Sequence, residues 1–230
     1  YTPSTAARAV DSSPETVALE SAFTHASWEL LHRQIDFDYI DCAIFLAGEI
    51  RDGALCYRDR AYRAVVLPCA RVLEERAAEK LAALADNGIA VFFCGEIPTL
   101  SRESGEKLDG TIPTAIADGK MRMSETADFG ALLDEALPDR CRPVRLTDST
   151  HPMLLSHSRV TTDGVRVVYL VNMDKTPVTV PVSVDGSYQD AREADAHTGE
   201  MKPFDYEKTA HGVSFTVTIA PGEGRFWLLA

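Results

Sequence analysis

Ala64–Pro68 reads AVVLP, and Ile89–Gly95 reads IAVFFCG. Each is a short, unbroken apolar run, and a polar, alanine-rich segment with helical spacing separates them. A strand covered on both faces has no polar side to alternate, so this order predicts a parallel strand, a crossover helix and a second parallel strand. Such sheets hold their chemistry in the loops after the strand C-termini. Those loops start here at Cys69 and Gly95, and they are poor in catalytic groups.

The flanking sequence predicts an α/β domain over residues 1–143. Helical spacing and stop signals indicate three helices, at about 14–32, 74–86 and 129–137. Ser13 is suited to cap the first helix, and Asn87-Gly88 to end the second. Phe37–Asp41 is read as a short strand or turn, and Glu96–Ser124 as mostly loop because Gly and Pro recur in it.

The pattern changes after Val144, where apolar and polar residues begin to alternate and turn signals recur. Short strands with Asp-Gly turns every 8–12 residues are typical of an antiparallel sandwich. We therefore predict an all-β domain over residues 144–230. Its strands are expected at 154–160, 165–172, 178–184, 191–196, 213–219 and 224–229.

Composition narrows the range of partners. The formal net charge of the 230 residues is -12, which argues against nucleic acid and against anionic membrane surfaces as partners. The 5 cysteines have no CxxC spacing, so neither a disulfide framework nor a structural zinc site is expected. A reducing, cytoplasmic environment fits such cysteines. The chain starts at Tyr1 without methionine, and we expect it to be a piece of a longer protein.

Several phrases, taken in order, resemble the C-terminal portion of large multidomain glycoside hydrolases of the α-L-rhamnosidase type. The β-galactosidase families that carry a glutamine-amidotransferase-like middle domain are similar in architecture. The phrases are FDYID at 37–41, GAL at 53–55, YRAVVLP at 62–68, VYLVN at 168–172 and DAHTGE at 195–200.

This resemblance implies a short, mainly parallel, flavodoxin-like or amidotransferase-like sheet followed by an antiparallel β-sandwich. It also implies that the catalytic carboxylates sit in an upstream (β/α)8 barrel of the same parent chain, which would act on a carbohydrate substrate. No residue here is therefore assigned a catalytic, cofactor-binding or metal-binding role. The α/β domain of such enzymes is a structural or oligomerising module, so a homo-oligomer is a further expectation. Tyr1–Val10 is too polar to supply the first strand, which we expect to be missing or upstream.

Cys94 is the main candidate for independent chemistry. A Cys at the end of a buried strand, followed by Gly, is where amidotransferase-like hydrolases hold a nucleophile. Such a thiol needs a depressed pKa and a general base. Glu96 stands nearby and no His is in an obvious partner position, so a buried, inert Cys94 is the favoured interpretation. Cys69 is a weaker candidate of the same kind.

The clustered carboxylates are expected to have structural roles, and the histidines no catalytic or metal-binding role. Asp36, Asp38 and Asp41 are expected to hold a turn and a strand edge, since Asp bonds nearby backbone N–H groups. Glu74 and Glu75 suit the first turn of a helix. The four histidines of the second domain lack metal-ligand spacing and are expected to be satisfied or exposed: His151, His157, His197 and His211.

The aromatic residues leave an alternative open. Five of them could stack on sugar rings: Trp28, Trp227, Tyr169, Tyr188 and Phe226. Core packing is favoured for Trp28, on a helix, and for Phe226-Trp227-Leu228, in a terminal strand. Phosphate-binding and dinucleotide-binding motifs are not present. Three hypotheses follow: a noncatalytic scaffold of a glycosidase, a cysteine hydrolase that uses Cys94, and a carbohydrate-binding module.

Overall fold

The computed structural model describes residues 14–137, 141–146 and 152–230. The chain divides into two compact units. The described part of unit 1 comprises residues 14–29 and Asp38–Leu137, and unit 2 comprises the segment Leu30–Phe37 together with the described residues after 140. Each unit has its own hydrophobic core.

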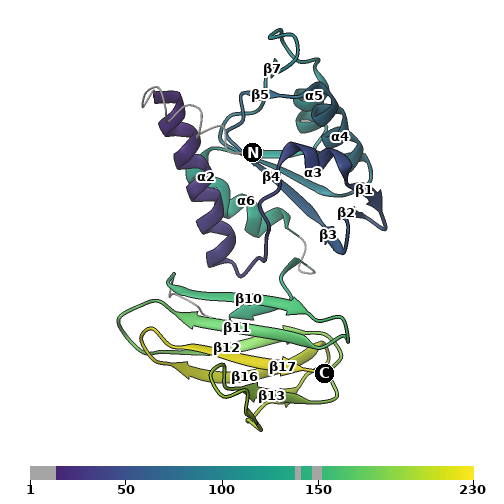
Figure 1. Ribbon diagram of the computed structural model, residues 1–230. Helices are drawn as coiled ribbons and strands as arrows, with labels where there is room; N and C mark the ends of the chain where they lie inside the picture. The colour runs from purple at the N-terminus through teal and green to yellow at the C-terminus, as the bar shows by residue number, and fades with distance from the viewer. Residues whose placement is uncertain (1–13, 138–140, 147–151) are drawn as a thin grey trace. The chain divides into compact units, whose positions relative to one another are not determined.

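Unit 1 is built on a three-stranded parallel sheet of order β4-β6-β8. Figure 1 labels β4, one edge strand of this sheet, and α4, the helix that follows it. Its strands are β4 (Ala64–Pro68), β6 (Ala90–Cys94) and β8 (Arg122–Ser124). Helix α4 (Glu75–Asp86) joins β4 to β6 and ends at Asn87, after which Gly88 takes a φ of +72°. The predicted strand–helix–strand unit is therefore confirmed, with the left-handed glycine where a helix C-terminus favours it.

The other helices and strands before residue 138 lie outside this sheet. They are α2 (Pro14–His32), α3 (Cys42–Ala47), β1 (Glu49–Arg51), β2 (Ala54–Tyr57), β3 (Arg60–Tyr62), β5 (Val72–Leu73), β7 (Leu100–Ser101), α5 (Thr111–Ala117), η1 (Thr126–Asp128) and α6 (Phe129–Ala136). The predicted helices near 14–32 and 129–137 are thus present, and the Ser13 cap falls outside the described residues. β1, β2 and β3 form an antiparallel meander, and β5 pairs with β7 in parallel.

Two predictions for unit 1 are corrected. Phe37–Asp41 is not a strand: it leads into α3, which Asp41 caps by accepting a hydrogen bond from the N–H of Ile44 at 2.8 Å. Glu96–Ser124 is loop-rich as predicted, but the prediction missed β7, α5 and the third parallel strand β8 within it. Pro113 does not prevent α5, since it lies in the first turn, where a helix has no use for that N–H.

Strand β6 separates two faces of the sheet. Val91 and Phe93 pack in one cluster with Leu81 and Leu84 of α4 and with residues of α5. Side chains alternate along a strand, so Phe92 and Cys94 point to the opposite face. Four of the five β6 residues are buried, which explains why its sequence shows no alternation.

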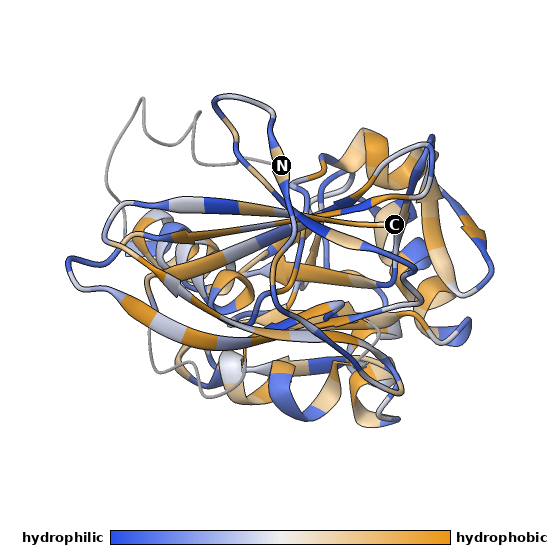
Figure 2. Cartoon of the chain, turned by 90° about the horizontal axis from the view of Figure 1, so that it is seen from below, coloured by the Kyte–Doolittle hydropathy of each residue, from blue (hydrophilic) through white to orange (hydrophobic). Residues whose placement is uncertain are grey.

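Unit 2 consists of two antiparallel sheets, of order β10-β11-β17-β13-β14 and β15-β16-β12-β9. The strands are β9 (Val144–Leu146), β10 (Leu154–Val160), β11 (Arg166–Asn172), β12 (Val178–Asp185), β13 (Ala191–Ala194), β14 (Met201–Lys202), β15 (Glu207–Lys208), β16 (Gly212–Ile219) and β17 (Gly224–Leu229). All six predicted strands are present, with ends shifted by at most two residues. Hydrophobic and hydrophilic residues alternate along several of them (Figure 2).

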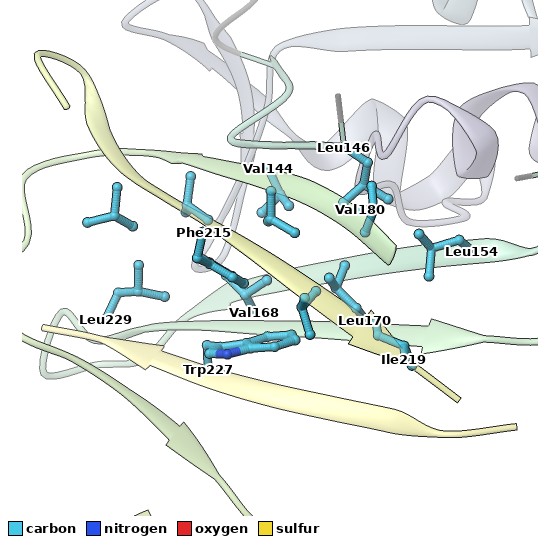
Figure 3. Packing of buried hydrophobic residues seen from close by; sticks show 14 of the residues in the cluster. Val144, Leu146, Leu154, Val168, Leu170, Val180, Phe215, Ile219, Trp227 and Leu229 are labelled. Atoms are coloured by element: carbon cyan, nitrogen blue, oxygen red, sulfur yellow. The ribbon is translucent and has the colours of Figure 1, made fainter. Parts of the chain in front are cut away.

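One core fills the space between the two sheets (Figure 3). Trp227 of β17 is 1% exposed and Phe215 of β16 is 6% exposed, and their ring centroids lie 5.0 Å apart. Val180 of β12 and Leu170 of β11 belong to the same cluster. The inward residues of both sheets therefore bury one another, which is what an antiparallel sheet with one polar face requires.

Candidate functional site

The carboxyl edge of the parallel sheet, where β4, β6 and β8 end together, is the first candidate site. The N–H of Cys69 donates to the carbonyl of Cys94 at 2.8 Å. The N–H of Gly95 donates to the carbonyl of Ser124 at 2.9 Å. These two bonds hold the three strand ends against one another, so the loops that follow start from fixed positions.

The chain is tightly packed where β6 ends. Gly95 has a φ of +85°, and a Cβ placed on it would lie 3.1 Å from Oγ1 of Thr126 and 3.6 Å from Cβ of Cys69. Cys69 itself has a φ of +38°, which is unusual for a residue with a side chain. The turn after Cys94 therefore requires glycine both for its backbone conformation and for space.

Cys94 is shielded from solvent and poorly suited to attack an external substrate. Its side chain has no exposed surface, and its Sγ lies 3.9 Å from the carbonyl oxygen of Ala22 in α2. Burial raises the pKa of the Cys94 thiol to about 11, a hydrogen bond with Thr126 lowers it in part, and electrostatic repulsion from Cys69 and Glu29 raises it further.

No cation among the described residues is a named cause of this shift, whereas a reactive cysteine depends on a nearby positive charge or a helix N-terminus. With a pKa of about 11, roughly one Cys94 thiol in 10,000 is ionised at pH 7. The arrangement therefore opposes the cysteine-hydrolase hypothesis, for Cys94 and for its buried neighbour Cys69.

The aspartates near residue 40 act as hydrogen-bond acceptors. Asp41 caps α3, and Asp38 accepts a hydrogen bond from the hydroxyl of Tyr62 at 3.1 Å. Asp36 accepts from the Oγ of Ser158 at 2.9 Å and from its backbone N–H at 3.1 Å. Ser158 belongs to β10, an edge strand, so Asp36 does bond a strand edge, but one that lies 122 residues further along the chain, and Asp41 caps a helix.

Glu74 and Glu75 stand at the start of α4, in a network that sequence reasoning did not find. Glu74 pairs with Arg102, and Glu75 accepts a hydrogen bond from the Oγ of Ser101 at 2.7 Å. The carboxylate of Glu103 accepts from the N–H of Glu75 at 3.1 Å, and this bond is the main cause that lowers the pKa of Glu103. The network ties the loop after β7 to the helix N-terminus, where a carboxylate such as that of Glu103 is favoured.

The histidines show no shared site. His157, His197 and His211 are exposed, and His151 falls outside the described residues. The N–H of His197 donates to Asp195 at 2.8 Å within a turn. Across the described parts of the chain, no group of three or more His, Cys, Asp or Glu residues is placed to hold a metal ion.

The aromatic residues divide between core and surface. Trp227 is in the core as expected, whereas Trp28 is 36% exposed on α2, so the core prediction for Trp28 is wrong. Tyr169 and Phe226 pair across β11 and β17 with ring centroids 4.4 Å apart, and both are half-buried. Because their neighbours Val168 and Trp227 point inward, this pair lies on the outward face, so the core prediction for Phe226 is wrong. Tyr188 is held by hydrogen bonds, accepting from Arg166 and donating to the carbonyl of Asp185.

Within the described residues, the helices are too short or too polar to cross a membrane. No protein-family model matches the chain, and no curated protein matches it by sequence.

Solved structures of glycoside hydrolases resemble it in fold. A rhamnosidase from Novosphingobium sp. PP1Y gives a TM-score of 0.65 at 18% identity, over 86% of this chain and 20% of that one. The GH42 β-galactosidase Gan42B from G. stearothermophilus gives 0.57 at 11% identity, over 94% of this chain and 37% of that one. An α-L-fucosidase isoenzyme 2 from Paenibacillus thiaminolyticus gives 0.55 at 12% identity, over 91% and 45%. This chain thus spans less than half the length of each.

Proposed function

We propose that this chain is a noncatalytic segment of a larger glycoside hydrolase, with an amidotransferase-like α/β domain followed by a β-sandwich. The observation that carries the proposal is the closed carboxyl edge of the parallel sheet. Cys94, the residue best placed to act there, lies under α2 with a pKa of about 11. In sheets of this type a substrate would bind in a crevice at the carboxyl ends of the strands. Packed side chains cover those ends here, so we expect the domain to have a structural role and no role in hydrolysis.

The fold comparisons support the glycosidase context. All three structures described above are glycoside hydrolases by name, and this chain covers between 20% and 45% of their length. In the proposed parent, the acid and the second carboxylate of glycoside hydrolysis would come from an upstream barrel. The sequence phrases of the rhamnosidase type favour a deoxysugar such as rhamnose as the substrate of that parent.

A substrate panel tests the proposal. The 230-residue chain alone should not hydrolyse aryl α-L-rhamnosides, aryl β-galactosides or aryl α-L-fucosides. The longer chain that includes the upstream region should hydrolyse at least one of them, and a Cys94→Ala variant of it should keep that activity. Turnover by the chain alone, or loss of turnover in a folded Cys94→Ala variant, would overturn the proposal.

A carbohydrate-binding surface is the second candidate, and the outward pair of Tyr169 and Phe226 favours it. Tyr169 also lies over Gly224, where a Cβ would come within 2.7 Å of its Cε2 atom. Together the two rings form a stacked, half-buried aromatic pair on the outward face of the larger sheet. Calorimetric titration with rhamnose-containing and galactose-containing oligosaccharides tests this function: binding must occur and must be lost in Tyr169→Ala, and absence of heat from all of them eliminates it.

A further inference from the structure

Two cysteines stand at the ends of neighbouring parallel strands. Cys69 follows β4 directly and Cys94 is the last residue of β6. Since the N–H of Cys69 bonds the carbonyl of Cys94 at 2.8 Å, standard backbone dimensions place their Cα atoms no more than about 6.7 Å apart. Disulfide bonds in proteins span Cα separations of about 4.4–6.8 Å, so the two residues fall within bonding range.

The side chain of Cys69 is turned toward the end of β6. With its φ of +38°, Cys69 leaves the extended path of β4, and its Cβ comes to 3.6 Å from the Cβ position of residue 95. That same position is 3.9 Å from the Cβ of Ala22, and Cys94 directs its Sγ to the carbonyl of Ala22. Both sulfur-bearing side chains therefore occupy the space under α2. The effect of Cys69 on the pKa of Cys94, secondary to that of burial, agrees with this proximity.

We propose that Cys69 and Cys94 form a site of reversible oxidation that closes to an intrachain disulfide. Hydrogen peroxide transfers one oxygen atom to the Cys69 thiol, which becomes a sulfenic acid, and its other oxygen leaves as water. The Cys94 thiol then attacks that sulfur, the S–S bond forms, the S–O bond breaks, and the hydroxyl leaves with the Cys94 proton as a second water. Both cysteines together lose two electrons and two protons, and a dithiol reductant restores them.

Cys69 takes the first step because it keeps some exposed surface, 7% against none for Cys94. Cys94 acts only on the adjacent sulfur, since α2 shields it from larger electrophiles. The other cysteines lie elsewhere: Cys42 begins α3, Cys56 is in β2, and Cys141 precedes β9. Oxidation by this route is therefore specific to one pair.

The bond would connect β4 and β6 across the crossover that contains α4. Closing this loop removes freedom from the unfolded chain and stabilises the sheet. The oxidised protein is thus expected to unfold at a higher urea concentration than the reduced protein, with no change in the secondary structure of either unit.

The test uses the whole chain with Cys42, Cys56 and Cys141 changed to Ser, so that only the pair remains. After treatment with hydrogen peroxide, and separately with oxidised glutathione, free thiols are counted in denaturant and the intact mass is measured. We expect both thiols to disappear, the mass to fall by about 2 Da, and a Cys69–Cys94 linked peptide to appear that dithiothreitol abolishes.

Matched controls are Cys69→Ser and Cys94→Ser in the same background, each of which should yield no intrachain link. If one of them fails to fold, the parent variant still decides the question through its peptide map. Two free thiols after exhaustive oxidation, a sulfinic acid in place of the disulfide, or a chain-to-chain link alone would overturn the proposal.

Discussion

The carbonyl oxygen of Ala22 in α2 lies 3.9 Å from the sulfur of Cys94 at the end of β6. This contact places a helix over the one position in the parallel sheet where a nucleophile would be expected. Burial under this helix raises the pKa of the thiol, and repulsion from Cys69 and Glu29 raises it further, so the thiol stays protonated. The glycosidase-scaffold interpretation depends on this closure.

Glycine at position 95 is expected to be needed for space as well as for backbone conformation. Gly95→Ala places a methyl group 3.1 Å from Oγ1 of Thr126 at a φ of +85°. Gly88→Ala is the matched control, because its φ is +72° and no atom lies within 4 Å of the added Cβ. Both variants should lose about 1–2 kcal/mol from the left-handed backbone, and Gly95→Ala should lose measurably more in urea unfolding. Equal losses of unfolding free energy in the two variants would show that a Cβ at position 95 meets no steric conflict.

Trp227 is expected to dominate the core of unit 2. Trp227→Ala removes a side chain that is 1% exposed between the two sheets and should cost about 3–5 kcal/mol of unfolding free energy. Thr216→Ala changes an outward position of β16 and should stay within about 0.5 kcal/mol. Urea unfolding followed by circular dichroism measures both. A Trp227→Ala variant as stable as Thr216→Ala would refute the shared core.

Lys80 joins α4 to the end of α3. Its ammonium group donates to the carbonyl of Leu46 at 2.8 Å and to that of Gly48, and its pKa is lowered by burial and then by Arg76. Lys80→Met keeps the apolar stem but leaves both carbonyls without this donor, which should cost about 1–2 kcal/mol. Lys120→Met, which breaks an exposed pair with Asp86, should leave the urea midpoint almost unchanged. The reverse order of effects would contradict the assignment.

The sequence predicted the elements whose signals are strong and local. β4 and β6 are unbroken apolar runs, and the strands of unit 2 alternate, so burial left a clear pattern in both. β8 escaped prediction because it is a three-residue edge strand with two exposed residues. Helix α3 has six residues, too few for helical periodicity to distinguish it from a strand.

The candidate site could be located by sequence but not characterised. The position of Cys94 follows from the length of β6. Its closure does not, because α2 lies some seventy residues earlier and only folding brings Ala22 to the thiol. The proximity of Cys69 to Cys94 depends on the register of β4 with β6 and on the left-handed conformation of Cys69, which no sequence motif predicts.

A stability profile in alkaline solution follows from the Cys94 thiol. Its pKa rises from 9.0 in the unfolded chain to about 11 in the folded one, so the folded state keeps its proton where the unfolded state loses it. This contribution to stability is complete below pH 9 and is lost as the pH rises from 9 to 11. A Cys94→Ala variant should lack this component of the pH dependence, and an identical alkaline profile in both proteins would count against the raised pKa.

The most direct measurement is the rate of iodoacetamide reaction with Cys94 in a folded variant whose other four cysteines are Ser. We predict slow labelling of Cys94 at pH 7. The labelling rate should rise about tenfold per pH unit up to pH 10 without levelling, because the pKa of the thiol is about 11. A rate that levels off below pH 8, with rapid labelling at pH 7, would reveal an accessible thiolate under α2 and would contradict the scaffold assignment.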